Sequence, residues 1–375
     1  MIKWPITIAS IAGAAIILIA IMCLSGCANV GYYWQSVTGH MAVVNAAKPI
    51  SEWLDDSKTP DATKRRLELS QRIRSFASSE LKLPDNPSYR RYADLQRRAV
   101  VTNVVAAPAY SLTLKTWCFP VAGCVGYRGY YAEADAKLEA AELEAQGLEV
   151  SVYGVPAYST LGYMNWAGGD PLLSTFINYP EGELARLIFH ELAHQVLYVK
   201  DDTMFNESFA TAVEKLGSRL WLEQHGLEAS RKEYAEFDAR RTQFRALTLR
   251  TRARLAVAYE ENKSEPLQKL DEVMLARSAR PLEKQKIMSM MRYEYEELKS
   301  SWAGYSGYDN WIAKANNASL GAQASYDELV PQFEALFEVH GKDWKIFYEA
   351  CKLLVPLPKD ARRKALAEQS GLALR

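Results

Sequence analysis

The segment HELAH at 190–194 constrains the fold and the chemistry of this chain more than any other feature. His190 and His194 stand four positions apart, so on a helix they project from the same side and can bind one metal ion. Glu191 between them can reach a water molecule at that ion without binding the metal itself. The apolar residues around the motif predict a buried helix over 182–199. The alternative interpretation is a pair of hydrogen-bonded core histidines without a metal.

A catalytic zinc ion takes three protein ligands and a water molecule, so the motif predicts a third ligand. The residues after His194 are QVLYVKDD, which excludes a third histidine in the usual extension of the motif. Glu207 is the candidate, because a short turn at 200–202 would bring the next helix back toward the histidines. Glu214 lies two turns further along the same face, where it would support a ligand from behind or serve as a reserve ligand. The alternative for Glu207 is an exposed helix position. The sequence thus predicts one Zn²⁺ per chain.

The N-terminus predicts export and a lipid anchor. Residues 1–26 carry one charge, Lys3, followed by an apolar run and the residues Leu-Ser-Gly before Cys27. This order resembles a bacterial lipoprotein signal peptide, which implies cleavage after 26 and lipidation of Cys27. Ala28 follows in place of the aspartate that retains lipoproteins at the inner membrane, so we expect the outer membrane, on the periplasmic side. The alternative is an uncleaved transmembrane helix, because the apolar run approaches about 20 residues.

The composition excludes some partners and bears on the cysteines. The formal net charge is zero, so no basic surface indicates nucleic acid.

In an oxidising periplasm, Cys118 and Cys124 are expected to form a disulfide around a short loop. Two free thiols or a thiolate metal site are the alternatives. Cys351 lies in an apolar helical pattern and is expected to be buried.

The patterns along the chain predict an α+β fold that is predominantly α-helical, with a small β-sheet in the middle of the sequence. We expect a signal peptide over 1–26, a lipid-anchored tether over 27–39, a region of N-terminal helices, sheet and zinc-site helices over 40–225, and an extended C-terminal helical region over 226–375. A strand over 155–162 would either pair with an extended peptide or lie in the core.

The stretches HELAHQ and FNESFA resemble the gluzincins, which are metallopeptidases that bind zinc through two histidines and a glutamate of the following helix. More closely, the chain is similar to a bacterial lipoprotein family of predicted aminopeptidases. The matching stretches are CFPVAGCVGYRGYY, AYSTLGY, DPLLSTF, FHELAHQVLY, FNESFATAVE and NNASLGAQASYDELVPQFEALF. The resemblance implies a zincin-like core, zinc ligation by His190, His194 and Glu207, Glu191 as general base, and hydrolysis of periplasmic peptides.

Several functional alternatives stay open at the level of sequence. The GxMEN segment with which known gluzincin aminopeptidases hold a free amine is absent, so an endopeptidase acting on envelope proteins is an alternative to an aminopeptidase. A non-catalytic envelope lipoprotein that uses the fold as a binding scaffold is another, although Glu191 favours an enzyme. The residue that stabilises the oxyanion is also open. The candidates are Tyr305, Tyr308 and Tyr326, each of which has packing as its alternative role. Arg128 is a separate candidate, which would either bind a substrate carboxylate or pair with a neighbouring acid.

Overall fold

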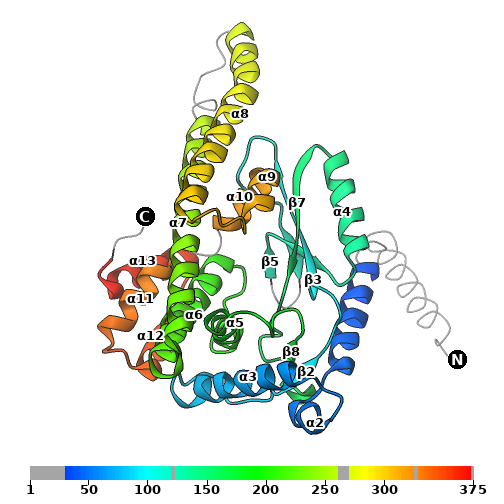
Figure 1. Cartoon of the computed structure of the whole chain (residues 1–375). Coiled ribbons are helices and arrows are strands. Elements are labelled where there is room, and N and C mark those ends of the chain that lie inside the picture. Colours follow the sequence, from blue (N-terminus) through cyan, green and yellow to red (C-terminus); the bar gives the residue numbers. More distant parts are fainter. Residues whose placement is uncertain (1–29, 120–122, 261–269, 325–327, 373–375) are drawn as a thin grey trace, which may run out of the picture.

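The computed structural model describes residues 30–119, 123–260, 270–324 and 328–372. Within these ranges the chain is mainly helical, with two three-stranded sheets and one two-stranded sheet (Figure 1). The predicted α+β class with predominant helix is therefore confirmed. The signal peptide predicted over 1–26 and the anchor Cys27 lie outside the described residues.

The central sheet has β3 (Val101–Pro108) in the middle, with β6 (Arg128–Tyr130) and β7 (Leu148–Val155) paired antiparallel on either side. Side chains of β3 alternate between the two faces of the sheet. Val104 and Ala106 pack with α4 (Glu133–Ala145), whereas Val105 and Ala107 face α10 (Asn317–Ala324). Because β7 pairs only with β3 among the described strands, it forms an edge of this sheet.

The main hydrophobic core lies among helices. These are α3 (Asp61–Ser79), α5 (Glu181–Ala193), α6 (Thr203–His225), α11 (Val330–Val339), α12 (Trp344–Leu354) and α13 (Lys359–Ser370). Phe209 of α6 is completely buried and lies against the rings of Phe333 and Phe347. The helices at the end of the chain therefore complete the core that holds α5 and α6 in place.

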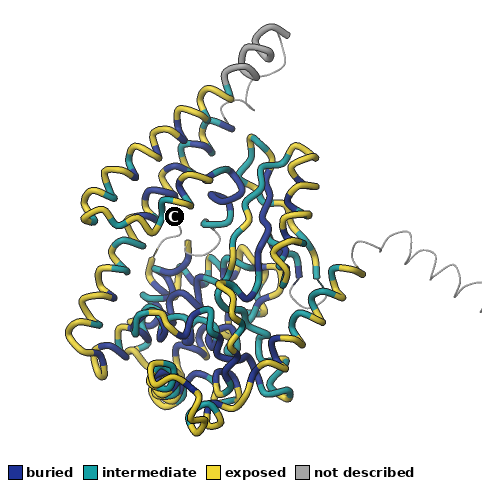
Figure 2. Tube along the Cα trace, turned by 45° about the vertical axis from the view of Figure 1, so that its right-hand side comes forward, coloured by how far each residue is buried: buried dark blue, intermediate teal, exposed yellow. Residues whose placement is uncertain are grey.

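The region 226–375 thus divides into two parts. One is formed by α11, α12 and α13 of the main core, and the other is a pair of long helices, α7 (Glu228–Glu260) and α8 (Leu270–Ser301), followed by α9 (Asp309–Lys314). Between them in the sequence, α10 packs on the central sheet. The pair projects from the rest of the molecule, and its outer faces are exposed while apolar residues such as Leu255 and Met291 meet between the helices (Figures 1 and 2).

Short elements connect these parts. They are β1 (Lys48–Pro49), β2 (Arg91–Ala93) and β8 (Leu172–Leu173) in one small sheet, the β4–β5 hairpin (Trp117–Phe119 and Gly123–Val125), α2 (Ile50–Asp55) and the 3₁₀ turn η1 (Asn165–Ala167). Among the described residues no helix has both the length and the apolar character to span a membrane.

Three details differ from the sequence predictions. Residues 30–46 are helical, so the described part of the predicted tether is regular structure, and its Tyr32 packs against the sheet and α4. The strand predicted over 155–162 is wrong beyond Val155, where β7 ends next to Pro156. The motif helix ends at Ala193 rather than at 199, so His194 occupies its C-terminal cap.

Candidate metal centre

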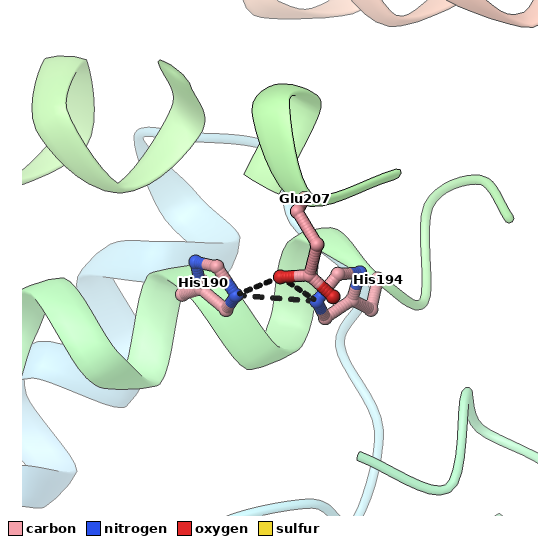
Figure 3. A group of neighbouring side chains, drawn as sticks. All are labelled: His190, His194 and Glu207. Atoms are coloured by element: carbon pink, nitrogen blue, oxygen red, sulfur yellow. Dashed lines mark hydrogen bonds and ion pairs between the residues drawn. The ribbon is translucent and has the colours of Figure 1, made fainter. Parts of the chain in front are cut away.

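The two histidines lie at the C-terminal end of α5. This helix starts after Pro180, has acidic residues in its first turn, which favour the helix dipole, and buries an apolar face that includes Leu184 and Ile188. His190 stands in the last turn, and the backbone N–H of His194 still bonds to the carbonyl of His190 at 3.3 Å. The four-residue spacing is therefore helical, and both imidazoles leave α5 on one side (Figure 3).

Glu207 is placed by the start of α6. The carboxylate of Asp202 accepts a hydrogen bond from the Phe205 N–H at 3.3 Å and caps the helix. The side chain of Asn206 bonds to both the N–H and the carbonyl of Val199 at 2.8 Å, which fixes the connection from α5. Arg362 of α13 forms a buried ion pair with Asp202. These contacts hold the first turns of α6 so that Glu207 reaches back over the histidines (Figure 3).

His190, His194 and Glu207 converge on one point. The Nε2 atoms of the two histidines are 3.2 Å apart. An Oε2 atom of Glu207 lies 3.3 Å from Nε2 of His190 and 3.7 Å from Nε2 of His194. Within the described part of the chain, these three residues are the group whose donor atoms could hold a metal ion. The side chains of His190 and Glu207 retain 16% and 15% exposure, so the group is open to solvent on one side.

Glu214 lies behind His190. Its Oε2 is 2.9 Å from Nδ1 of His190, and its Oε1 accepts a hydrogen bond from Nε of Arg186 at 2.6 Å. Because a carboxylate only accepts hydrogen bonds, Nδ1 of His190 carries a proton, and Nε2 is the ring nitrogen that faces His194 and Glu207. Glu214 therefore occupies the supporting position expected from the sequence. Nδ1 of His194 has no hydrogen-bond partner among the described residues.

Charges at the centre are strongly coupled. Burial alone would raise the pKa of Glu207, but the charges and hydrogen bonds of His194 and His190 outweigh burial and hold the pKa of Glu207 well below its usual value. Burial also opposes ionisation of Glu214, whose pKa falls to about 2 because Arg186 and His190 face it. Burial raises the pKa of Glu191 despite the opposing charges of His190 and His194. The centre therefore combines ionised carboxylates at Glu207 and Glu214 with a more basic carboxylate at Glu191.

Two clefts meet at the cluster. A cavity of about 510 Å³, here called the metal cleft, is lined by His190, Glu191, His194 and Glu207 together with many apolar and aromatic side chains. A second cavity of about 470 Å³, the lateral cleft, shares Leu187, His190 and Glu191 with it. Glu191 therefore faces both clefts, at the place where a substrate lying across them would pass the histidines.

Tyr127 is a functional candidate that the sequence did not single out. It lines the metal cleft, and burial, followed by the charge of Glu207, raises its pKa far above the usual tyrosine value. Its phenol is therefore protonated at any working pH and can donate a hydrogen bond. Its position depends on the sheet, because Tyr127 packs beside β3 with Tyr153. Its distance in the sequence from the HELAH segment gave no indication that Tyr127 would lie near the histidines.

The structure places the oxyanion candidates Tyr305 and Tyr308, and the candidate carboxylate-binding residue Arg128, outside both clefts. Tyr308 stacks on Phe244 with ring centroids 3.9 Å apart, and Tyr305 packs beside it, both in the cluster around α7 to α9. Arg128 forms an ion pair with Glu139 at 3.1 Å and covers the ring of Tyr32. None of these three lines either cleft. Tyr326 lies outside the described residues.

The cysteines lie in two different parts of the structure. Cys118 and Cys124 are joined by a disulfide across the β4–β5 hairpin, and Cys351 is free and buried. The N–H of Cys124 donates to Asp201 at 2.5 Å, so the hairpin is tied to the connection between α5 and α6. Gly123 has φ +76, and a Cβ there would lie 2.4 Å from the Asp201 carboxylate, so this contact requires glycine.

Comparison with known proteins gives one match. Residues 31–366 match the model of a protein family described as "Putative aminopeptidase". This range includes α5, α6, the β4–β5 hairpin and the sheet that borders the clefts. No significant match was found among curated proteins or among solved structures.

Proposed function

Because this chain belongs to the family described as "Putative aminopeptidase", we propose that it is a metallopeptidase that holds one zinc ion with His190, His194 and Glu207. Family membership supports peptidase chemistry in general. The single observation that carries the metal assignment is the convergence of the three donor atoms next to Glu191. A zincin-like arrangement, in which the following helix supplies the third ligand, agrees with this geometry.

The separation of the donor atoms fits zinc. Ligand atoms lie about 2.0–2.2 Å from zinc, so two ligands of a tetrahedral site are about 3.3–3.6 Å apart. The three distances in the cluster are 3.2, 3.3 and 3.7 Å. Glu214 also orients the lone pair of His190 Nε2 toward the same point, and two imidazole lone pairs this close to a carboxylate favour a cation between them.

Zinc bound here would act as a Lewis acid that polarises the scissile carbonyl and increases the acidity of a water molecule. Glu191 takes the proton from the attacking water and passes it to the nitrogen of the leaving amine. Burial raises the pKa of its carboxyl group, which makes Glu191 a stronger base than an exposed glutamate and suits a group that must both accept and return a proton. Tyr127, protonated and in the same cleft, donates a hydrogen bond to the oxygen that becomes negative.

An extended peptide would add to β7 on the side where this strand pairs with no other described strand. Ser151, Tyr153 and Val155 alternate along this strand and line the lateral cleft or the metal cleft. Asn316 covers the start of the edge by donating to the carbonyl of Val150 at 2.7 Å. Ser151 and Tyr153 line the lateral cleft together with Glu191, so a peptide bound along this strand would pass Glu191.

The family description favours removal of N-terminal residues, and one observation favours an endopeptidase as the second candidate. An aminopeptidase needs a negative group for the free amine. Among the described residues, the carboxylates that line the metal cleft are Glu191 and Glu207, both already assigned, and the lateral cleft adds only Glu214, which is paired with Arg186. The cleft also continues on both sides of Glu191, so a chain could pass through it.

We also propose that Cys27 anchors the protein to the outer membrane, facing the periplasm. The helix over 30–46 has no Asp, Glu, Lys or Arg. Val30, Trp34, Val37 and Met41 follow one side of it and are 66%, 71%, 60% and 42% exposed. This apolar stripe begins three residues after Cys27, within about 11 Å of an anchor, where it would lie at the membrane interface. Replacing Cys27 with alanine should release the protein from the membrane fraction.

The test is hydrolysis of a peptide library by the purified zinc-loaded mature protein, with each peptide in free and N-acetylated form. Cleavage of only the free peptides identifies an aminopeptidase, and cleavage of both forms identifies an endopeptidase. If neither form is cleaved, the enzymatic proposal is wrong and the binding-scaffold alternative takes its place.

A further inference from the structure

We propose that a basic cavity beside the metal cleft binds a carboxylate group of the peptide substrate. The cavity has a volume of about 480 Å³, and its basic residues are Arg252 of α7 and Lys359 and Arg363 of α13. The inference rests on the proposed peptidase function, because it specifies the kind of peptide that the site accepts.

The basic cavity adjoins the metal centre directly. Tyr127 and Thr203 line both the basic cavity and the metal cleft, and Tyr153 lines both the basic cavity and the lateral cleft. Tyr127 is close enough to Glu207 for the charge of that carboxylate to raise its pKa. A peptide with its scissile bond at Glu191 therefore needs to extend only past Tyr127 to place a carboxylate among the basic side chains.

The basic side chains have no neutralising partner. Among the described residues, none of Arg252, Lys359 and Arg363 forms an ion pair, and the only carboxylate that lines the cavity is that of Asp201. Asp201 already accepts the hydrogen bond from Cys124 N–H. Three cations around one partly engaged carboxylate leave an excess of positive charge, which favours an anionic ligand.

The guanidinium groups are also incompletely hydrogen-bonded. The Nε atoms of Arg252 and Arg363 are buried and have no hydrogen-bond partner among the described residues. The one contact found for an Arg363 nitrogen is 3.3 Å to the sulfur of Met204, a weak acceptor. Buried donors without partners are unfavourable, and a guanidinium offers a fork that a carboxylate can accept with both oxygens. A substrate carboxylate would satisfy these donors.

The lateral cleft provides the contrast. Its Arg186 is paired with Glu183 and Glu214, and its Arg241 is paired with Glu183 and Asp238. These two arginines already have their anions within the protein, and Arg245, the third arginine of this cleft, is not without a partner either. The excess positive charge therefore lies on the basic-cavity side of the metal centre. There it would favour peptides that carry a carboxylate, either at the C-terminus or on a side chain.

The carboxylate can come from the C-terminus of a short peptide or from an Asp or Glu side chain. One peptide sequence in four forms separates these sources: a C-terminal carboxylate or amide, each with Asp or Asn at the position under test. We expect the preferred carboxylate form to be hydrolysed with a kcat/KM about tenfold above its neutral counterpart, as charge-assisted hydrogen bonds imply. Binding of the same four peptides to the Glu191→Gln protein, measured by calorimetry, gives a readout that needs no turnover.

The variants assign the effect to the cavity. In the double variant Arg252→Gln/Arg363→Gln the tenfold preference should disappear, so that the carboxylate and neutral peptides are hydrolysed with equal kcat/KM. The conservative pair Arg252→Lys/Arg363→Lys should restore part of the preference. Arg250→Gln is the matched control, because Arg250 lies on the same helix and pairs with Glu294 on the surface, so the preference should remain. Thermal melting checks that each variant is folded.

Two results would overturn the inference: equal affinity and hydrolysis of the four peptide forms by the wild-type protein, or a preference that survives in the Gln double variant. Hydrolysis of all forms at one rate refutes the basic-cavity proposal alone. If the wild-type protein hydrolyses none of the four forms, the peptidase proposal fails, and binding of the four peptides to the Glu191→Gln protein then tests the carboxylate preference separately.

Discussion

His190 and Glu214 stand on two successive helices, and Nδ1 of the histidine lies 2.9 Å from Oε2 of the glutamate. This contact links the metal centre to the ion pairs of Arg186, because the other oxygen of Glu214 accepts from Nε of Arg186 at 2.6 Å. The orientation of His190 is therefore set by Glu214 and Arg186, neither of which belongs to the group of three candidate metal ligands. The same contact leads to the first prediction.

Glu214→Gln should weaken zinc binding by about 10- to 100-fold, because the amide supports the imidazole less well than the carboxylate does. Competition with a chromogenic chelator measures the change. Glu223→Gln is the matched control, since Glu223 is an exposed residue of the same helix. An unchanged zinc affinity in Glu214→Gln would mean that Glu214 contributes nothing to the orientation of His190.

Glu207→Ala should reduce the zinc content of the purified protein far below one ion per chain. The variant leaves two histidines and removes the only carboxylate of the cluster, so the metal loses one of three ligands. Elemental analysis after dialysis against a weak chelator measures the loss, with Glu223→Ala as the control. Full zinc occupancy in Glu207→Ala would assign the third ligand to another residue.

Tyr127→Phe should lower kcat by about 100- to 1000-fold with little change in KM, because its phenol donates to charge that develops only in the transition state. Steady-state kinetics with one peptide measure both parameters. Tyr163→Phe is the control, since Tyr163 is 67% exposed and lines neither cleft. A change confined to KM would indicate that Tyr127 binds substrate without stabilising the transition state.

Arg362→Ala should reduce the free energy of unfolding by about 3–5 kcal/mol, because it leaves the buried carboxylate of Asp202 without its cation. The guanidinium also donates to the carbonyls of Leu354 and Leu357, which would lose these partners. Denaturant titration measures the change. Lys364→Ala, at an exposed position of the same helix, should stay within about 0.5 kcal/mol of the wild type. A similarly small effect of Arg362→Ala would show that the ion pair does not hold the start of α6.

The sequence predicted the parts of the site that depend on local geometry. The spacing of His190 and His194 determines their common face on α5, and the short connection to α6 made Glu207 the best third ligand. Glu214 followed from the same helical periodicity. These residues come from one continuous stretch, so their arrangement depends on helix geometry and one turn.

The remaining site depends on contacts between distant segments. Tyr127 reaches the metal cleft because the sheet places it there, and the basic cavity joins Arg252 of α7 with Arg363 of α13. Neither follows from any periodicity. The strand prediction over 155–162 was wrong because Pro156 removes a backbone donor just where β7 ends. The described part of the predicted tether is helical, because Tyr32 packs against the central sheet, a contact between segments that are distant in the sequence.

The central claim is that Glu191 acts as a general base beside a zinc ion held by the adjacent histidines. The most direct measurement compares zinc content and peptide hydrolysis in the wild-type and Glu191→Gln proteins, prepared identically. We predict about one zinc ion per chain in both proteins, with kcat for the variant at least about 1000-fold below that of the wild type. A Glu191→Gln protein that hydrolyses peptides at the wild-type rate would contradict the claim.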